Sequence, residues 1–124
     1  MRILHVEDDA DTRVLVALIL EAEGWQVVSV TSKAEAISAA RGESFDLYLI
    51  DNWIEDDQGT DLCVALRAVN SLTPILFYSG VAYPLDIQTA LACGAQGYLT
   101  KPSTPQALVD EIRKVTKSQG VSES

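Results

Sequence analysis

Side chains with complementary chemistry follow four separate apolar runs of this chain. In chain order the groups are two carboxylates, a third carboxylate, a hydroxyl and an amine: Glu7 and Asp8, Asp51, Ser79, and Lys101. Carboxylate oxygens bind divalent cations, and a carboxylate can also act as a nucleophile that forms an aspartyl phosphate. A hydroxyl and a lysine ammonium can stabilise phosphoryl oxygens during such a transfer. If the four run ends meet, the sequence predicts one site for a cation and a phosphoryl group.

The apolar runs themselves have the pattern of strands that are buried on both faces. Strands are expected at 2–6, 25–30, 46–51, 74–79 and 97–100, where short stretches are almost continuously apolar. Helices are expected at about 10–22, from Ser32, at about 60–69, from Pro84 to before Gly94, and after Thr104. This alternation predicts an α/β fold, a three-layer α/β/α sandwich whose five-stranded parallel sheet gathers its carboxyl strand ends at one crevice. The pattern alone leaves two strand orders open.

Further expectations concern side-chain packing. The helix at about 10–22 is expected to carry one apolar face, and so is the last helix; the residues are Leu15, Leu18, Ile19 and Ala22 in the first, and Leu108, Ile112 and Val115 in the last. The single histidine, His5, lies inside an expected strand and is predicted to be neutral and packed. Cys63 and Cys93 are expected to be reduced thiols, because the histidine and cysteine content offers no zinc site.

Composition and charge limit the classes of function. The chain has 124 residues, of which 18 are acidic and 9 are basic, and its net charge is −9. This charge would repel nucleic-acid backbones, so direct nucleic-acid binding is not expected. No apolar run is long enough for a membrane helix, and the N-terminus lacks the pattern of a signal peptide, which favours a cytoplasmic protein. We expect one domain at 1–118 and a disordered tail at 119–124.

The order and spacing of several motifs resemble the receiver domains of two-component response regulators, the CheY-like superfamily. The matching segments are 3–9, 46–51, 74–80 and 94–102, together with Gly59, which stands eight residues after Asp51. The resemblance extends over about residues 1–118. It implies a flavodoxin-like sheet with strand order 2-1-3-4-5.

The resemblance also implies roles for individual residues. Asp51 would accept a phosphoryl group from a sensor histidine kinase or a histidine phosphotransfer protein, in a reaction that needs Mg²⁺. The supporting residues would be Asp8, Asp51 and the backbone carbonyl of Trp53 as metal ligands, Glu7 as a ligand through water, Lys101 and Ser79 at the phosphoryl group, and Ser79 with Tyr98 as the pair that repositions on activation. The Lys101–Pro102 peptide bond is typically cis in this family.

The implied product is a switched protein-interaction surface rather than a turned-over substrate. An unidentified downstream protein would read that surface, and phosphorylation-dependent dimerisation is a further option. We therefore do not expect an enzyme in the ordinary sense, since the chain would only accept and lose its own phosphoryl group.

Two features depart from the family pattern. Glu55 stands where the loop usually carries a proline. Trp53 is bulky for a residue beside the acceptor, and Val81 lies two residues after Ser79. We hypothesise that this apolar pair shields the phosphoryl group from water and slows its loss.

Two alternative functions follow from other features of the sequence. The atypical loop leaves open a receiver-fold interaction module that does not use phosphate. An aspartyl-phosphate phosphatase would need a motif that 9–13 matches only in its two acids, since Arg13 stands at the fifth position. That alternative is therefore disfavoured.

Overall fold

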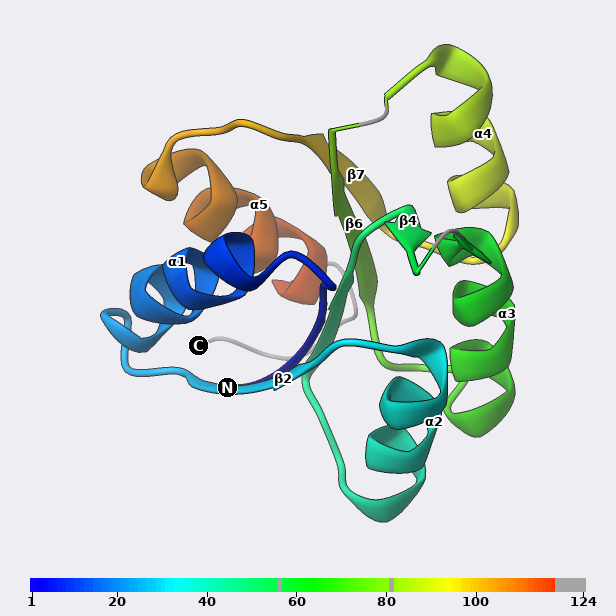
Figure 1. The fold of residues 1–124 in the computed structure, drawn as a ribbon, viewed down its shortest axis with the longest axis horizontal. Coiled ribbons are helices and arrows are strands. Elements are labelled where there is room, and N and C mark those ends of the chain that lie inside the picture. The colour runs from blue at the N-terminus through cyan, green and yellow to red at the C-terminus, as the bar shows by residue number, and fades with distance from the viewer. Residues whose placement is uncertain (56, 81, 118–124) are drawn as a thin grey trace.

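A computed structural model describes residues 1–55, 57–80 and 82–117 of the chain (Figure 1). A five-stranded sheet consists of β1 (Arg2–Val6), β2 (Gln26–Val30), β3 (Leu47–Ile50), β6 (Ile75–Ser79) and β7 (Gly97–Thr100). The helices are α1 (Ala10–Glu21), α2 (Lys33–Gly42), α3 (Gly59–Val69), α4 (Pro84–Ala92) and α5 (Pro105–Lys117). A separate short hairpin pairs β4 (Trp53–Ile54) with β5 (Asp57–Gln58). The expected tail at 119–124 lies outside the described residues.

The sheet is parallel and its strand order is β2-β1-β3-β6-β7. Counted over the five expected strands, this is the order 2-1-3-4-5, so the flavodoxin-like expectation is confirmed. The hairpin of β4 and β5 was not expected, because each of its strands has only two residues and no apolar run marks it. Within the described residues, no helix is long and apolar enough to cross a bilayer.

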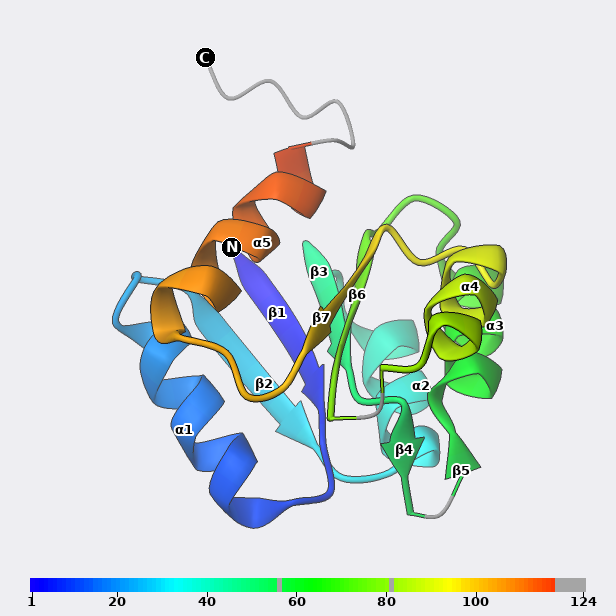
Figure 2. The same ribbon diagram turned by 90° about the horizontal axis from the view of Figure 1, so that it is seen from above.

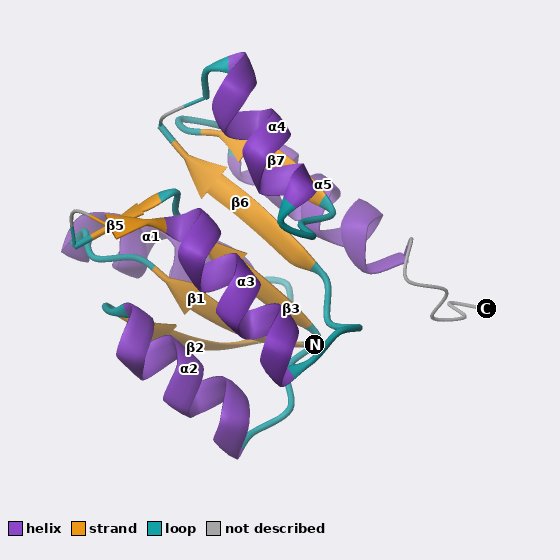
Figure 3. Cartoon of the chain, turned by 90° about the vertical axis from the view of Figure 1, so that its right-hand side faces the viewer, coloured by secondary structure: helices purple, strands orange, loops and turns teal. Residues whose placement is uncertain are grey.

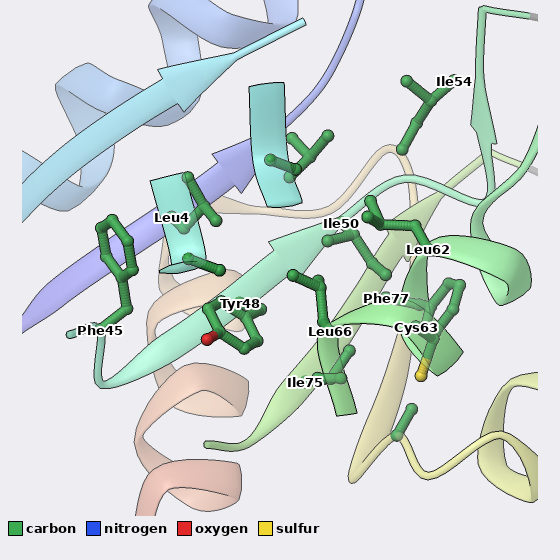
Figure 4. Packing of buried hydrophobic residues seen from close by; sticks show 14 of the residues in the cluster. Leu4, Phe45, Tyr48, Ile50, Ile54, Leu62, Cys63, Leu66, Ile75 and Phe77 are labelled. Carbon is green, nitrogen blue, oxygen red and sulfur yellow. The ribbon is translucent and has the colours of Figure 1, made fainter. Parts of the chain in front are cut away.

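Helices cover both faces of the sheet, as Figure 2 shows: α1 and α5 lie on one side, and α2, α3 and α4 on the other. Successive strand residues therefore enter different cores. On β3, Tyr48 and Ile50 pack with α2 and α3 (Figure 4), whereas Leu47 and Leu49 pack with α1 and α5. This two-sided burial explains why the strands lack polar alternation.

Side-chain caps fix where two of the helices begin. Asp9 caps α1, since its Oδ2 accepts the N–H of Thr12 at 2.9 Å. Ser32 caps α2 by accepting the N–H of Glu35 at 3.1 Å, and Glu35 Oε1 accepts the N–H of Thr31 at 3.0 Å. The cap at Asp9 matters for function, because it starts α1 directly after Glu7 and Asp8.

The prediction of which face of α1 is buried is wrong. Leu15 and Leu18 are 58% and 62% exposed, whereas Val16 and Leu20 are 1% and 0% exposed and face the sheet. Ala22 is also exposed, and only Ile19 of the expected face packs against the core. Apolar residues fill the whole segment 14–20, so helical periodicity could not distinguish its faces.

The last helix and the two thiols agree with the sequence expectations. In α5, Leu108, Ile112 and Val115 are buried against the sheet. Both cysteines are free, and the Cys63 thiol donates to the Cys93 carbonyl at 3.4 Å. Burial raises the pKa of Cys63 to about 11, which keeps it protonated at neutral pH.

The prediction that His5 is neutral and packed is confirmed. Its side chain is buried in β1, and its Nδ1 has no hydrogen-bond partner among the residues that the structure describes. Burial, assisted by the positive charge of Lys101, lowers the pKa of His5 to about 3. The folded chain therefore holds an uncharged imidazole at neutral pH.

The buried imidazole predicts a pH-dependent stability. The unfolded chain protonates His5 near pH 6.5 and the folded chain only near pH 3, so unfolding takes up a proton between these values. Between pH 6.5 and pH 5 the wild-type chain should lose about 2 kcal/mol more unfolding free energy than a His5→Leu variant. Urea denaturation at several pH values measures this difference. Parallel stability curves for the two proteins would contradict it.

Candidate functional site

The strand register brings the four predicted run ends together. Val6 pairs with Ile50 on neighbouring strands, so Glu7 and Asp51 leave the sheet side by side. On the other side, the N–H of Lys101 donates to the carbonyl of Ser79 at 2.9 Å. All five strands point the same way, and their carboxyl ends lie on the side of the sheet where the short hairpin is found (Figure 3). The site therefore follows from parallel pairing at the carboxyl edge of the sheet.

An ion-pair triad lies at the centre of the site. Lys101 Nζ lies 2.5 Å from Glu7 Oε1 and 3.0 Å from Asp51 Oδ2. Burial and the nearby charge of Asp51 raise the pKa of Glu7, although the hydrogen bond from Lys101 opposes that rise. Burial would lower the pKa of Lys101, but its bonds to the two carboxylates outweigh burial and raise it. Lys101 is therefore a firmly protonated ammonium beside the proposed nucleophile.

Asp8 does not take part in this triad. It is exposed, and its Oδ2 accepts the backbone N–H of Glu55 at 2.9 Å. Glu55 has a φ of 52°, in the left-handed region. The proline that usually stands at this position has no N–H and a φ near −65°. It could therefore neither donate this hydrogen bond nor adopt the left-handed conformation. The departure at Glu55 thus ties the loop after Asp51 to Asp8.

Trp53 lies on the same loop, beside the acceptor. Its side chain is 43% exposed, and its backbone N–H donates to Asp51 Oδ1 at 3.3 Å. This bond and the one from Lys101 engage both oxygens of Asp51. The expected role of the Trp53 carbonyl as a metal ligand stays a prediction. The Lys101–Pro102 peptide bond is cis, as the resemblance implies.

The oxygen donors of the site suit Mg²⁺, but not as a set of three clustered carboxylates. Among the described residues, no three His, Cys, Asp or Glu side chains lie close enough to share an ion, and Glu7 is bound to Lys101. Asp8 accepts one hydrogen bond from the described residues and keeps further lone pairs. Asp51 is only partly buried. Mg²⁺ takes one or two carboxylates and keeps several waters, so Asp8 and Asp51 fit such an ion.

Ser79 and Tyr98, the expected switch pair, lie together beside the triad. Ser79 is buried at the end of β6, and the Tyr98 ring stacks on Phe77 with centroids 5.5 Å apart. Burial raises the pKa of the Tyr98 phenol, while side-chain hydrogen bonds with Ser79 and Asn52 oppose the rise. The structure thus brings the two predicted residues into contact and adds Asn52, which the sequence reasoning did not identify.

Gly59 allows the loop after Asp51 to approach α3. Its N–H donates to the Asn52 carbonyl at 2.6 Å. A Cβ at this position would lie 2.3 Å from the Asp51 carbonyl oxygen and 3.1 Å from Phe77 Cε2. Only glycine permits this approach, which explains the motif spacing of Gly59 after Asp51.

The fold and the site together place this protein among the doubly wound α/β domains that pair a carboxylate with a lysine at the carboxyl ends of their strands. Residues 3–113 match the family described as the response regulator receiver domain. The chain belongs to that family.

Individual proteins show the same likeness. The DNA-binding response regulator MtrA of Mycobacterium tuberculosis is 33% identical over 112 residues, which cover 90% of this chain and 49% of MtrA. A CheY-like receiver domain protein of Methanospirillum hungatei has a TM-score of 0.90 and 28% identity, over 96% of this chain and 95% of that chain. A response regulator of Burkholderia pseudomallei, solved with a phosphorylated aspartic acid, a calcium ion and citrate, has a TM-score of 0.86 and 25% identity, over 94% and 69%.

The chain spans about half the length of the curated relatives that it matches, 49% in the case of MtrA. The family assignment therefore concerns the receiver domain. What the whole MtrA protein binds does not transfer to this chain.

The close contact at Gly59 predicts a large effect of one added methyl group. Gly59→Ala should lower the free energy of unfolding by about 2 kcal/mol, because the Cβ forces apart two backbone segments. Gly42→Ala is the matched control, since a Cβ there meets nothing within 4 Å and the residue ends α2. The control should be neutral or slightly stabilising, by at most about 1 kcal/mol. Equal effects of the two variants in urea denaturation would argue against the contact.

Proposed function

We propose that this receiver domain is a cytoplasmic phosphorylation switch in which Asp51 accepts a phosphoryl group from a phosphohistidine on a sensor histidine kinase or a histidine phosphotransfer protein. One observation carries the proposal: the partly buried Asp51 carboxylate lies at the sheet edge with Lys101 Nζ 3.0 Å from its Oδ2. The phosphorylated aspartic acid in the Burkholderia relative supports it.

The transfer exchanges one bond at phosphorus for another. An Asp51 oxygen attacks the phosphorus, the bond to the histidine nitrogen breaks, and the nitrogen keeps the electron pair. Lys101 offsets the negative charge that then lies on the phosphoryl oxygens, and the Ser79 hydroxyl donates to one of them. The chain thus supplies position and charge, and it accepts and loses one group without turning over a substrate.

Asp8 and Asp51 would hold the divalent cation of this reaction. When bound, Mg²⁺ neutralises charge on the phosphoryl oxygens and orients the group for in-line transfer. Asp8 is exposed and accepts one hydrogen bond from the described residues, which leaves oxygen lone pairs for the ion. The Burkholderia relative was solved with a calcium ion, which is also a divalent cation.

The output would be a change in a protein-interaction surface built on α4, β7 and α5. Ser79 ends β6, which pairs with β7, and Tyr98 lies on β7. Movement of Ser79 toward a phosphoryl oxygen would therefore act directly on the strand between these helices. A downstream protein or a second copy of the domain would bind this surface.

Incorporation of phosphate at Asp51 is the direct test. With Mg²⁺ and acetyl phosphate, intact-mass spectrometry should show the addition of one phosphoryl group, and Asp51→Asn should abolish it because the nucleophile is lost. Asp46→Asn is the matched control, since Asp46 accepts the Arg2 N–H at 2.7 Å at the opposite edge of the sheet. It should be modified like wild type. Modification of Asp51→Asn, or none of wild type, would contradict the proposal.

A receiver-fold interaction module that does not use phosphate is the second candidate. The Glu55 bond to Asp8 favours it, since this bond ties one carboxylate of the proposed metal site to the loop. Tryptophan fluorescence separates the two functions. In a Trp25→Phe chain, Trp53 is the remaining tryptophan, and Mg²⁺ followed by beryllofluoride should change its emission. An unchanged emission, without phosphate on Asp51, would favour the interaction module.

The exposed indole of Trp53 predicts an effect on phosphoryl lifetime. Trp53→Asn should speed the loss of the phosphoryl group severalfold, because a polar side chain lets water reach the phosphorus more easily. Val81, the other member of the expected shielding pair, lies outside the described residues. Trp25→Phe is the control, since Trp25 packs near Arg113 at the opposite edge of the sheet. An unchanged dephosphorylation rate in Trp53→Asn would rule out shielding by this residue.

A further inference from the structure

Asn52 is a buried amide directly after the acceptor. The residue is only 4% exposed. Its Nδ2 donates to the Tyr98 hydroxyl at 3.3 Å, across a sequence separation of 46 residues. Its Oδ1 is buried and has no hydrogen-bond partner among the described residues. An orphaned amide oxygen costs free energy, so its presence beside the acceptor calls for an explanation.

The Tyr98 hydroxyl has two hydrogen-bond partners, and the proposed phosphorylation would remove one of them. It hydrogen bonds with both Ser79 and Asn52. If Ser79 turns its hydroxyl to a phosphoryl oxygen on Asp51, Tyr98 loses that partner. A half turn of the Asn52 carboxamide would then present the orphaned Oδ1 to the phenol, so the same side chain can serve the hydroxyl as donor or as acceptor.

We propose that Asn52 is a positioning residue that holds the Tyr98 ring in its inward position on Phe77 and keeps the phenol hydrogen bonded after Ser79 leaves it. The function of this anchor in signalling rests on the proposed phosphoryl switch. The anchor itself exists in the unmodified chain, where it can be tested alone. Asn52 thereby connects the residue after the acceptor to the aromatic side chain on β7.

Fluorine NMR of chains labelled with meta-fluorotyrosine tests the anchor without phosphate. The chain has four tyrosines, and Tyr98→Phe assigns the resonance of interest. In Asn52→Leu, the Tyr98 resonance should shift toward a solvent-exposed value, while those of Tyr48, Tyr78 and Tyr83 stay in place. Thr60→Val is the matched control, since it also replaces a buried polar side chain beside this loop. A Tyr98 resonance that stays at its wild-type position in Asn52→Leu would overturn the proposal.

Beryllofluoride affinity tests the coupling to the acceptor. Asn52→Leu should weaken binding about tenfold, because the bound state leaves the half-buried phenol with neither Ser79 nor Asn52 as a partner. Tyr98→Phe removes that phenol, so the double variant should bind like Tyr98→Phe alone. A merely structural role for Asn52 predicts additive losses instead. Additive losses would overturn the coupling between the two side chains.

The proposal stays testable if Asn52→Leu fails to fold or if the wild-type chain does not bind beryllofluoride. If Asn52→Leu does not fold, Asn52→Ser removes the reach of the amide with a smaller side chain, and the same shift of the Tyr98 resonance is required. If the wild-type chain does not bind beryllofluoride, the phosphoryl-acceptor function fails, while the fluorine spectrum still supports or overturns the anchoring of Tyr98.

Discussion

Charge balance at the carboxyl edge of the sheet is the constraint on which the site depends. Parallel pairing of β1 and β3 places the carboxylates of Glu7 and Asp51 side by side, where their repulsion opposes folding. Lys101, from the end of β7, binds both and so offsets that repulsion. The chain thus joins three strand ends through one ammonium. The same ammonium lies where negative charge would increase during the proposed phosphoryl transfer, so one interaction would serve both stability and chemistry.

Much of the fold was predictable because strand burial leaves a strong local pattern. The run at 47–50 is apolar throughout, as expected for a strand covered on both faces, and the structure buries each residue of β3. Asp51 and Lys101 were predictable because they interrupt such runs at an end, where parallel strands gather. The strand order needed the resemblance to the receiver family, since several topologies satisfy the same local pattern.

Two of the features that the sequence did not predict share a physical cause, since each depends on a contact distant in sequence. The buried face of α1 is set by the sheet against which it packs, so Val16 and Leu20 are not distinguishable from Leu15 and Leu18 in a uniformly apolar segment. Asn52 resembles an ordinary turn residue until its amide is seen to meet Tyr98, 46 residues away.

The bond between Glu55 and Asp8 would couple the conformation of the loop to the binding of a cation at Asp8. A cation that bound Asp8 Oδ2 in place of the Glu55 N–H, whose nitrogen lies 2.9 Å away, would release the loop from Asp8. If the bond lowers the affinity of the site for the ion by some factor, then ion binding shifts the loop toward the released conformation by the same factor. A chain with proline at this position would have no such amide to give up. In this receiver domain, the concentration of the ion would therefore act as an input to loop conformation before any phosphoryl group arrives.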